Sequence, residues 1–103
     1  VDEVTVHVIS DLIVPNVFSP NGDGVNDVWE ILGTENYQEV YVVVFDRSGQ
    51  KVLEVVNYNP LRFWNGTNRR GNALPTSTYY YSITVDRNLE TERTVKGSVS
   101  IIR

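Results

Sequence analysis

The chain has 103 residues, of which 41% are hydrophobic, and this is enough for one small domain with its own core. Its net charge is -4 and its lysines and arginines are scattered, which argues against nucleic acid as a partner. Cysteine is absent, so disulfides and thiolate zinc sites are excluded, and no apolar run is long enough to span a membrane as a helix.

The first predicted elements are two short apolar segments. Residues 4–9 alternate apolar and polar side chains, the period of a half-buried strand, and residues 12–14 form a second run that Pro15 ends or keeps at a sheet edge. Residues 4–9 can belong to the main domain, but we predict that residues 1–11 are a linker or the last strand of a preceding repeat. Neither a methionine nor a signal peptide is present, as we expect of a segment excised from a longer protein.

A glycine-rich and oxygen-rich loop follows at residues 21–27. It holds two glycines, two asparagines and two aspartates, a mixture typical of a structured loop and not of a strand or helix interior. Apolar residues on both sides of the loop, ending at Phe18 and resuming at Val28, attach it to the core.

The oxygen atoms of this loop suggest two alternatives. Calcium prefers carboxylate, amide and backbone oxygens, and an EF-like loop ends on a bidentate glutamate. The candidate calcium ligands are Asn21, Asp23, the Val25 carbonyl, Asp27 and Glu30. Counting back, however, places Ser19, a poor ligand, in the first position, and Pro20 stiffens the approach to the loop. The alternative is a turn that its own Asn and Asp side chains hold together without metal.

The rest of the chain is predicted as short strands separated by turns. The predicted strands are residues 28–31, 39–45, 51–56, 78–85 and 94–102. The second is apolar on both faces, so we expect it in the centre of a sheet, in a hairpin with the third through a turn that ends at Gly49. Gly97 is a candidate bulge in the last strand. No helical periodicity exceeds one turn, and seven or eight short strands indicate an antiparallel β-sandwich.

Two groups of side chains could carry chemistry. His7 is the single histidine and lies on the polar face of a predicted strand. Asp23 and Asp27 could form an acid–base pair, but two aspartates in one tight loop more often cap turns or hold a cation. We therefore predict that the chain is not an enzyme.

Aromatic residues could instead form a sugar-binding platform, with Trp29, Trp64 and residues 79–81 as its members. Aromatic residues that alternate along a strand are more often core on one face. We predict that Trp29, Tyr79 and Tyr81 are core residues and that Tyr80 lies on the surface.

Several segments, in order, resemble the gliding-motility-associated C-terminal domain. This is the type B sorting domain of proteins that the type IX secretion system of Bacteroidota exports. Residues 14–27 resemble its opening, residues 45–52 its central hairpin, residues 64–66 and 74–81 its Trp-Asp-Gly and tyrosine-rich segments, and residues 96–103 its closing strand.

The resemblance covers residues 12–103 and has three departures. Ser48 replaces the usual tryptophan of the hairpin, Asn65 the usual aspartate and Ser77 the usual glycine. Asn65 and Ser77 keep chemistry that suits turns. The loss of the tryptophan removes an exposed aromatic residue from the hairpin, so a partner contact at the hairpin would lack this side chain.

The resemblance implies that the domain is a targeting signal and does not catalyse a reaction. Such a domain sits at the C-terminus of a large adhesin or surface protein and directs it through the outer-membrane translocon to the cell surface. The implied partners are the translocon and an outer-membrane β-barrel protein of the PorP/SprF family. We predict an all-β fold, an immunoglobulin-like antiparallel sandwich of about seven strands, and a monomeric state. The alternative to the sorting function is a calcium-stabilised adhesin or carbohydrate-binding module.

We expect the partner to recognise a folded surface, because the motif residues are spread over the whole chain. The predicted surface combines the loop at residues 21–27 with the final strand. A terminal strand at a sheet edge has unpaired backbone groups and suits the addition of a partner's strand. The candidate partner-binding residues are Asn21, Asp23, Asn26, Asp27, Lys96, Val99, Ile101 and Arg103.

Overall fold

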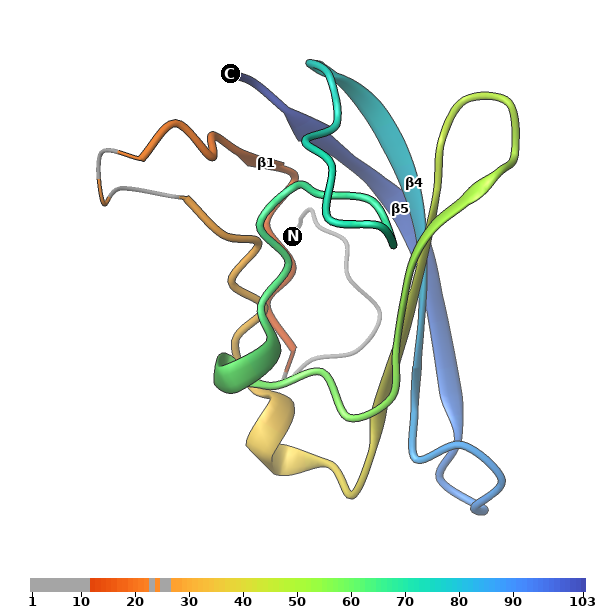
Figure 1. Cartoon of the computed structure of the whole chain (residues 1–103). Coiled ribbons are helices and arrows are strands. Elements are labelled where there is room, and N and C mark those ends of the chain that lie inside the picture. Colours follow the sequence, from red (N-terminus) through yellow and green to blue (C-terminus); the bar gives the residue numbers. More distant parts are fainter. Residues whose placement is uncertain (1–11, 23, 25–26) are drawn as a thin grey trace, which may run out of the picture.

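The computed structural model of the chain describes residues 12–22, 24 and 27–103. They form one five-stranded sheet in the order β1-β5-β4-β2-β3 (Figure 1). The strands are β1 (Val17–Phe18), β2 (Val40–Phe45), β3 (Lys51–Val55), β4 (Ser77–Val85) and β5 (Arg93–Ile101). The described part also has two 3-10 turns, η2 (Thr34–Asn36) and η3 (Pro60–Arg62). No helix in these residues has the length and apolar character to cross a membrane.

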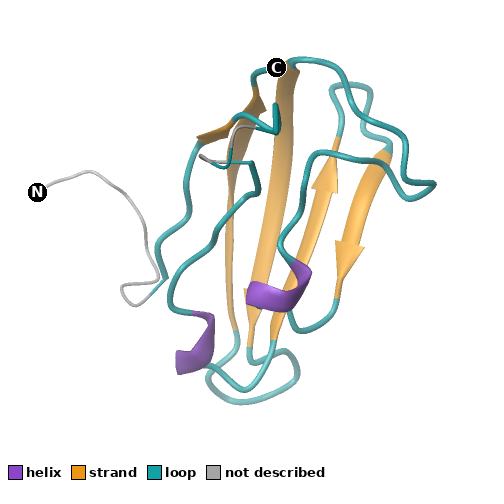
Figure 2. Cartoon of the chain, turned by 60° about the vertical axis from the view of Figure 1, so that its left-hand side comes forward, coloured by secondary structure: helices purple, strands orange, loops and turns teal. Residues whose placement is uncertain are grey.

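Irregular segments cover one face of the sheet and form a second layer (Figures 1 and 2). Isolated bridges join them, Ile13 with Leu32 and Trp29 with Trp64. This arrangement confirms the all-β, sandwich-like prediction. The described part has five strands and not about seven, because residues 12–14 and 28–31 contribute only isolated bridges. Pro15 has no N–H to donate to a neighbouring strand. In this layer the Trp29 indole and the Tyr58 hydroxyl donate to backbone carbonyl oxygens that would otherwise pair within a strand ladder.

Strand β2 is central, as its apolar faces predicted. It pairs antiparallel with β3 on one side and with β4 on the other. Val42 and Val44 are fully buried, and Val43 on the opposite face is only 7% exposed. Gly49 closes the hairpin to β3 at φ 89°, a conformation that glycine adopts without strain.

The pairing of β1 corrects the prediction of a purely antiparallel sheet. β1 runs parallel to β5, with Val17 opposite Ser100 and Phe18 opposite Ile101. The sheet is therefore mixed. A short hairpin forces antiparallel pairing, whereas these two strands are joined through the whole body of the domain, so their relative direction is free to be parallel.

Gly97 lies in a regular part of β5, and the predicted bulge there is wrong. It pairs with Tyr81 in an unbroken register along β4. A Cβ at Gly97 would lie 2.5 Å from the Tyr81 hydroxyl oxygen. The Tyr81 ring crosses this position and packs on Trp29, with ring centroids 5.2 Å apart. Glycine is needed here to make room for an aromatic ring and not to bend the strand.

The core lies between the sheet and the irregular layer. Trp29 and Tyr79 are buried and Tyr81 is half-buried, whereas Tyr80 is 45% exposed, so the predicted core and surface tyrosines are confirmed. The irregular layer contributes Leu12, Trp29, Ile31, Tyr58 and Trp64, and the sheet contributes Phe18, Val40, Val42, Val44, Val52, Tyr79, Ile83, Val85, Val99 and Ile101.

Candidate functional site

The two tryptophans form the centre of the core and not a binding platform. Trp64 is 3% exposed and Trp29 is fully buried. The Trp64 ring centroid lies 5.4 Å from that of Phe18, 6.1 Å from Trp29 and 6.0 Å from Tyr79. Neither indole can present its face to a sugar ring, so of the proposed platform only Tyr80 remains available.

A buried hydroxyl group connects the two tryptophan backbones. Trp29 donates its N–H to the Trp64 carbonyl oxygen at 2.8 Å, the first half of an antiparallel bridge. The Tyr58 hydroxyl occupies the second half: it donates to the Trp29 carbonyl oxygen and accepts from the Trp64 N–H, both at 2.7 Å. Burial raises the pKa of Tyr58 well above its usual range. The hydroxyl is therefore a neutral, fully engaged structural group.

Arg103 fastens the end of β5 to three other segments. Its guanidinium donates to the carbonyl oxygens of Pro20 at 3.2 Å, Gly66 at 2.8 Å and Leu74, and its backbone N–H donates to Thr76 Oγ1 at 2.9 Å. Gly66 has φ 83°, and a Cβ there would lie 3.0 Å from both Arg103 Nη2 and Pro20 Cγ. The charged group of Arg103 thus holds the domain together and joins the approach to the loop at residues 21–27 with the final strand.

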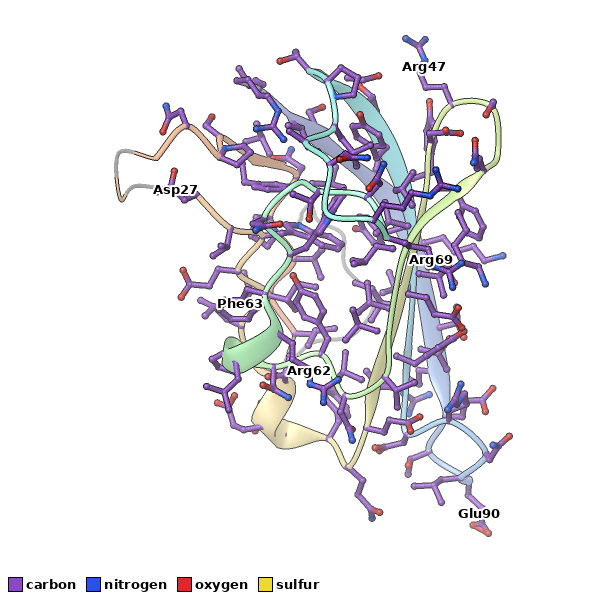
Figure 3. All side chains as sticks on the ribbon, in the orientation of Figure 1. Asp27, Arg47, Arg62, Phe63, Arg69 and Glu90 are labelled. Atoms are coloured by element: carbon purple, nitrogen blue, oxygen red, sulfur yellow. The ribbon has the colours of Figure 1, made fainter. Side chains whose placement is uncertain are left out.

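The described part of the loop is organised by Asp27 (Figure 3). Its Oδ1 accepts from the backbone N–H groups of Asn21 at 3.2 Å and Gly22 at 2.9 Å, and its Oδ2 accepts from Gly24 at 2.7 Å. The described part of the loop is therefore closed by one of its own carboxylates, which binds three backbone N–H groups that precede it in the sequence. Glu30 is exposed. Asp23, Val25 and Asn26, like His7, lie outside the described residues.

Calcium binding by this loop stays a prediction. Within residues 12–22, 24 and 27–103, no group of three or more His, Cys, Asp or Glu side chains is placed to hold a metal ion. If the loop binds calcium, calorimetric titration of the chain should give a saturable heat that Asp23→Ala removes. Identical flat traces for the parent chain and the variant would eliminate calcium as a ligand.

Strand β5 presents only part of its predicted contact residues at the surface. Val99 and Ile101 are fully buried and pack in the core, because odd-numbered residues of β5 point toward the irregular layer. Lys96, an even-numbered residue, is exposed on the opposite face. The side chains of Val99 and Ile101 cannot meet a partner, so recognition through this strand must use backbone groups and the exposed side chains of the opposite face, which include Lys96.

The end of β5 is not free, but its first two-thirds form a sheet edge in the described structure. The Ser100 N–H donates to the Asn16 carbonyl at 2.9 Å and the Ile102 N–H to the Phe18 carbonyl at 3.1 Å, so β1 covers this end. Before Ser100, none of the described residues pairs with the outer edge of β5.

Comparison with known families identifies the family to which the chain belongs. The model of the CHU_C type IX secretion signal domain matches residues 12–101. The chain belongs to this family. No curated protein matches the chain. Membership confirms the predicted role as a sorting signal, and it implies export through the type IX secretion system. A secretion signal family is not an enzyme family, which agrees with the prediction that the domain catalyses no reaction.

Sequence reasoning missed the two residues that organise the CHU_C core and its end. Tyr58 lies between Asn57 and Asn59 in a segment that reads as plain loop, and only its aromatic character could have marked it. The prediction for Arg103 was contact with a partner, whereas its guanidinium binds carbonyl groups from three segments of its own domain. No local sequence pattern predicts contacts between residues so far apart in the chain.

Proposed function

We propose that this CHU_C domain is a type B sorting signal at the C-terminus of a large adhesin or other surface protein of a gliding bacterium of the Bacteroidota. We propose further that an outer-membrane β-barrel protein of the PorP/SprF family recognises it as a monomeric folded body, after which the passenger reaches the cell surface.

The burial of the motif residues supports the proposal that the partner recognises the folded domain. Trp64 and Tyr79, from two of the segments that resemble the family, are buried against each other. A partner cannot read buried rings as a linear peptide. Their contribution to export is therefore made through the fold that they stabilise, and through the surface that this fold displays.

The described residues that lead into the loop lie near the end of the final strand. Residues 20–22, β1 and the C-terminal end of β5 are on the same side of the molecule (Figure 1). Arg103 joins them by donating to Pro20 at the loop and to Gly66 and Leu74 beside it. Removal of residues 96–103 would delete the buried Val99 and Ile101 and unfold the domain, so point substitutions are the informative test.

The test is export of a fluorescent passenger fused to the domain. Trp64→Ala should reduce export roughly tenfold or more, because loss of a buried tryptophan destabilises the fold by about 3–5 kcal/mol. Leu61→Ser, at a side chain that is 94% exposed, is the matched control and should export normally. Normal export of a Trp64→Ala fusion whose domain is unfolded by circular dichroism would contradict folded recognition, and export without any PorP/SprF protein would contradict the proposed partner.

A further inference from the structure

The backbone groups at the open edge of β5 can be assigned residue by residue. In a strand, N–H and C=O groups point alternately to the two neighbours. The Ser100 N–H points to β1, since it donates to Asn16. Thr94, Lys96 and Ser98 share the parity of Ser100, so their N–H and C=O groups also point away from β4. Among the described residues no strand pairs with these three.

The outer face of the sheet beside this edge has a shallow apolar groove. No main-chain layer of the described part covers this face (Figure 1). In the register, Tyr80 lies opposite Phe45 on one side and opposite Ser98 on the other. The residues that line the groove are Val43, Phe45, Tyr80, Ser82, Lys96 and Ser98, with the backbone at Tyr81 and Gly97. Ser98 is small, so the exposed ring of Tyr80 stays accessible from the open edge.

The positive charge of Lys96 beside the groove indicates which charge a strand that pairs with this edge should carry. Lys96 is the one charged residue that lines it, and Lys96 forms no ion pair with any of the described residues. Glu54, across the face, is engaged with Tyr41 and Lys51. A second copy pairing antiparallel about Lys96 would place two lysines opposite each other, and like charges in that position repel. A strand with a carboxylate opposite Lys96 is favoured instead.

We propose that the β5 edge accepts an extended segment of the export partner that carries an acidic residue opposite Lys96 and, two positions away, a large apolar residue opposite Ser98. The backbone of the segment pairs with Thr94, Lys96 and Ser98. Its apolar side chain crosses Ser98 and packs on Tyr80, while its carboxylate meets the Lys96 ammonium. The proposal rests on the proposed function, because it names the chemistry by which the partner reads the folded domain.

Hydrogen exchange tests the open edge in the free chain. The amides of Thr94, Lys96 and Ser98 should exchange roughly 100-fold or more faster than those of Val95, Gly97 and Val99, which pair with β4. Nuclear magnetic resonance resolves each amide. Equal protection of both sets in the free chain would mean that another segment, residues 1–11 or a second copy, already occupies the edge, and it would overturn the proposal.

Peptide binding tests the chemistry. The probe is a seven-residue peptide of alternating threonine and valine in which one glutamate and one tyrosine stand two positions apart on the same face, added at millimolar concentration. It should protect the three exposed amides. Lys96→Glu should weaken binding roughly tenfold and reverse the preference toward a lysine-for-glutamate peptide, and Tyr80→Ala should weaken binding of both.

The control is Lys51→Glu, which makes the same charge change on β3 at the opposite edge of the sheet and should leave binding unchanged. Absence of binding, or binding that ignores the charge at residue 96, would overturn the edge proposal alone. Export by an unfolded Trp64→Ala fusion would overturn the proposed function, whatever the peptides show.

Discussion

Tyr58→Phe is expected to lower the free energy of unfolding by about 2–4 kcal/mol, although it removes a single oxygen atom. The hydroxyl donates to the Trp29 carbonyl and accepts from the Trp64 N–H inside a core where both tryptophans are at most 3% exposed. Phenylalanine fills nearly the same space but leaves a buried donor and a buried acceptor unpaired. Each such group costs about 1–3 kcal/mol.

Urea unfolding followed by tryptophan fluorescence measures this effect, since Trp29 and Trp64 are the two tryptophans of the chain and flank the hydroxyl. Tyr80→Phe is the matched control. It deletes the same oxygen from a ring that is 45% exposed, and it should change stability by less than about 0.5 kcal/mol. Equal midpoints for the two variants would show that the bridge between the tryptophan backbones contributes nothing.

Gly66→Ala is expected to destabilise the domain by about 2–5 kcal/mol, the sum of two effects. A residue with a side chain is strained at φ 83°, by roughly 1–2 kcal/mol. The added Cβ also lies 3.0 Å from Arg103 Nη2 and from Pro20 Cγ, so the guanidinium or the proline ring must move. Overpacking of this kind costs about 1–3 kcal/mol.

Gly71→Ala separates these two effects. Gly71 has φ 86° but no atom within 4 Å of the added Cβ, so its substitution should cost only the backbone strain. The difference between the two variants then measures the contacts at Gly66. A double-mutant cycle with Arg103→Ala should show a coupling of about 1 kcal/mol, because the guanidinium supplies one of the two close contacts. Equal destabilisation at Gly66 and Gly71 would contradict this account of the Arg103 contacts.

Local patterns predicted most of the sheet correctly. The apolar faces of residues 39–45 indicated the central strand β2, and Gly49 indicated its hairpin. The alternation along residues 78–85 separated Tyr79 from Tyr80. The same reasoning gave strands in the irregular layer, where the structure has only isolated bridges, because hydrogen bonds from Tyr58 and from the Trp29 indole replace parts of a ladder.

The candidate site was less predictable than the fold. The loop at residues 21–27 and the final strand were found from composition and from the resemblance. The burial of Val99 and Ile101, the cover that β1 places on the end of β5, and the engagement of Arg103 were not. Each depends on a neighbour that is far away along the chain.

The sequence by itself determined the class of fold, the central hairpin, the surface tyrosine and membership of a secretion signal family, because side-chain period and turn chemistry act within a few residues. Only the tertiary structure decided which edge of β5 is open, which residues of that strand face the core, and which carbonyls Arg103 binds. These features depend on how the folded chain brings together backbone groups that are distant in the sequence, and no local rule specifies them.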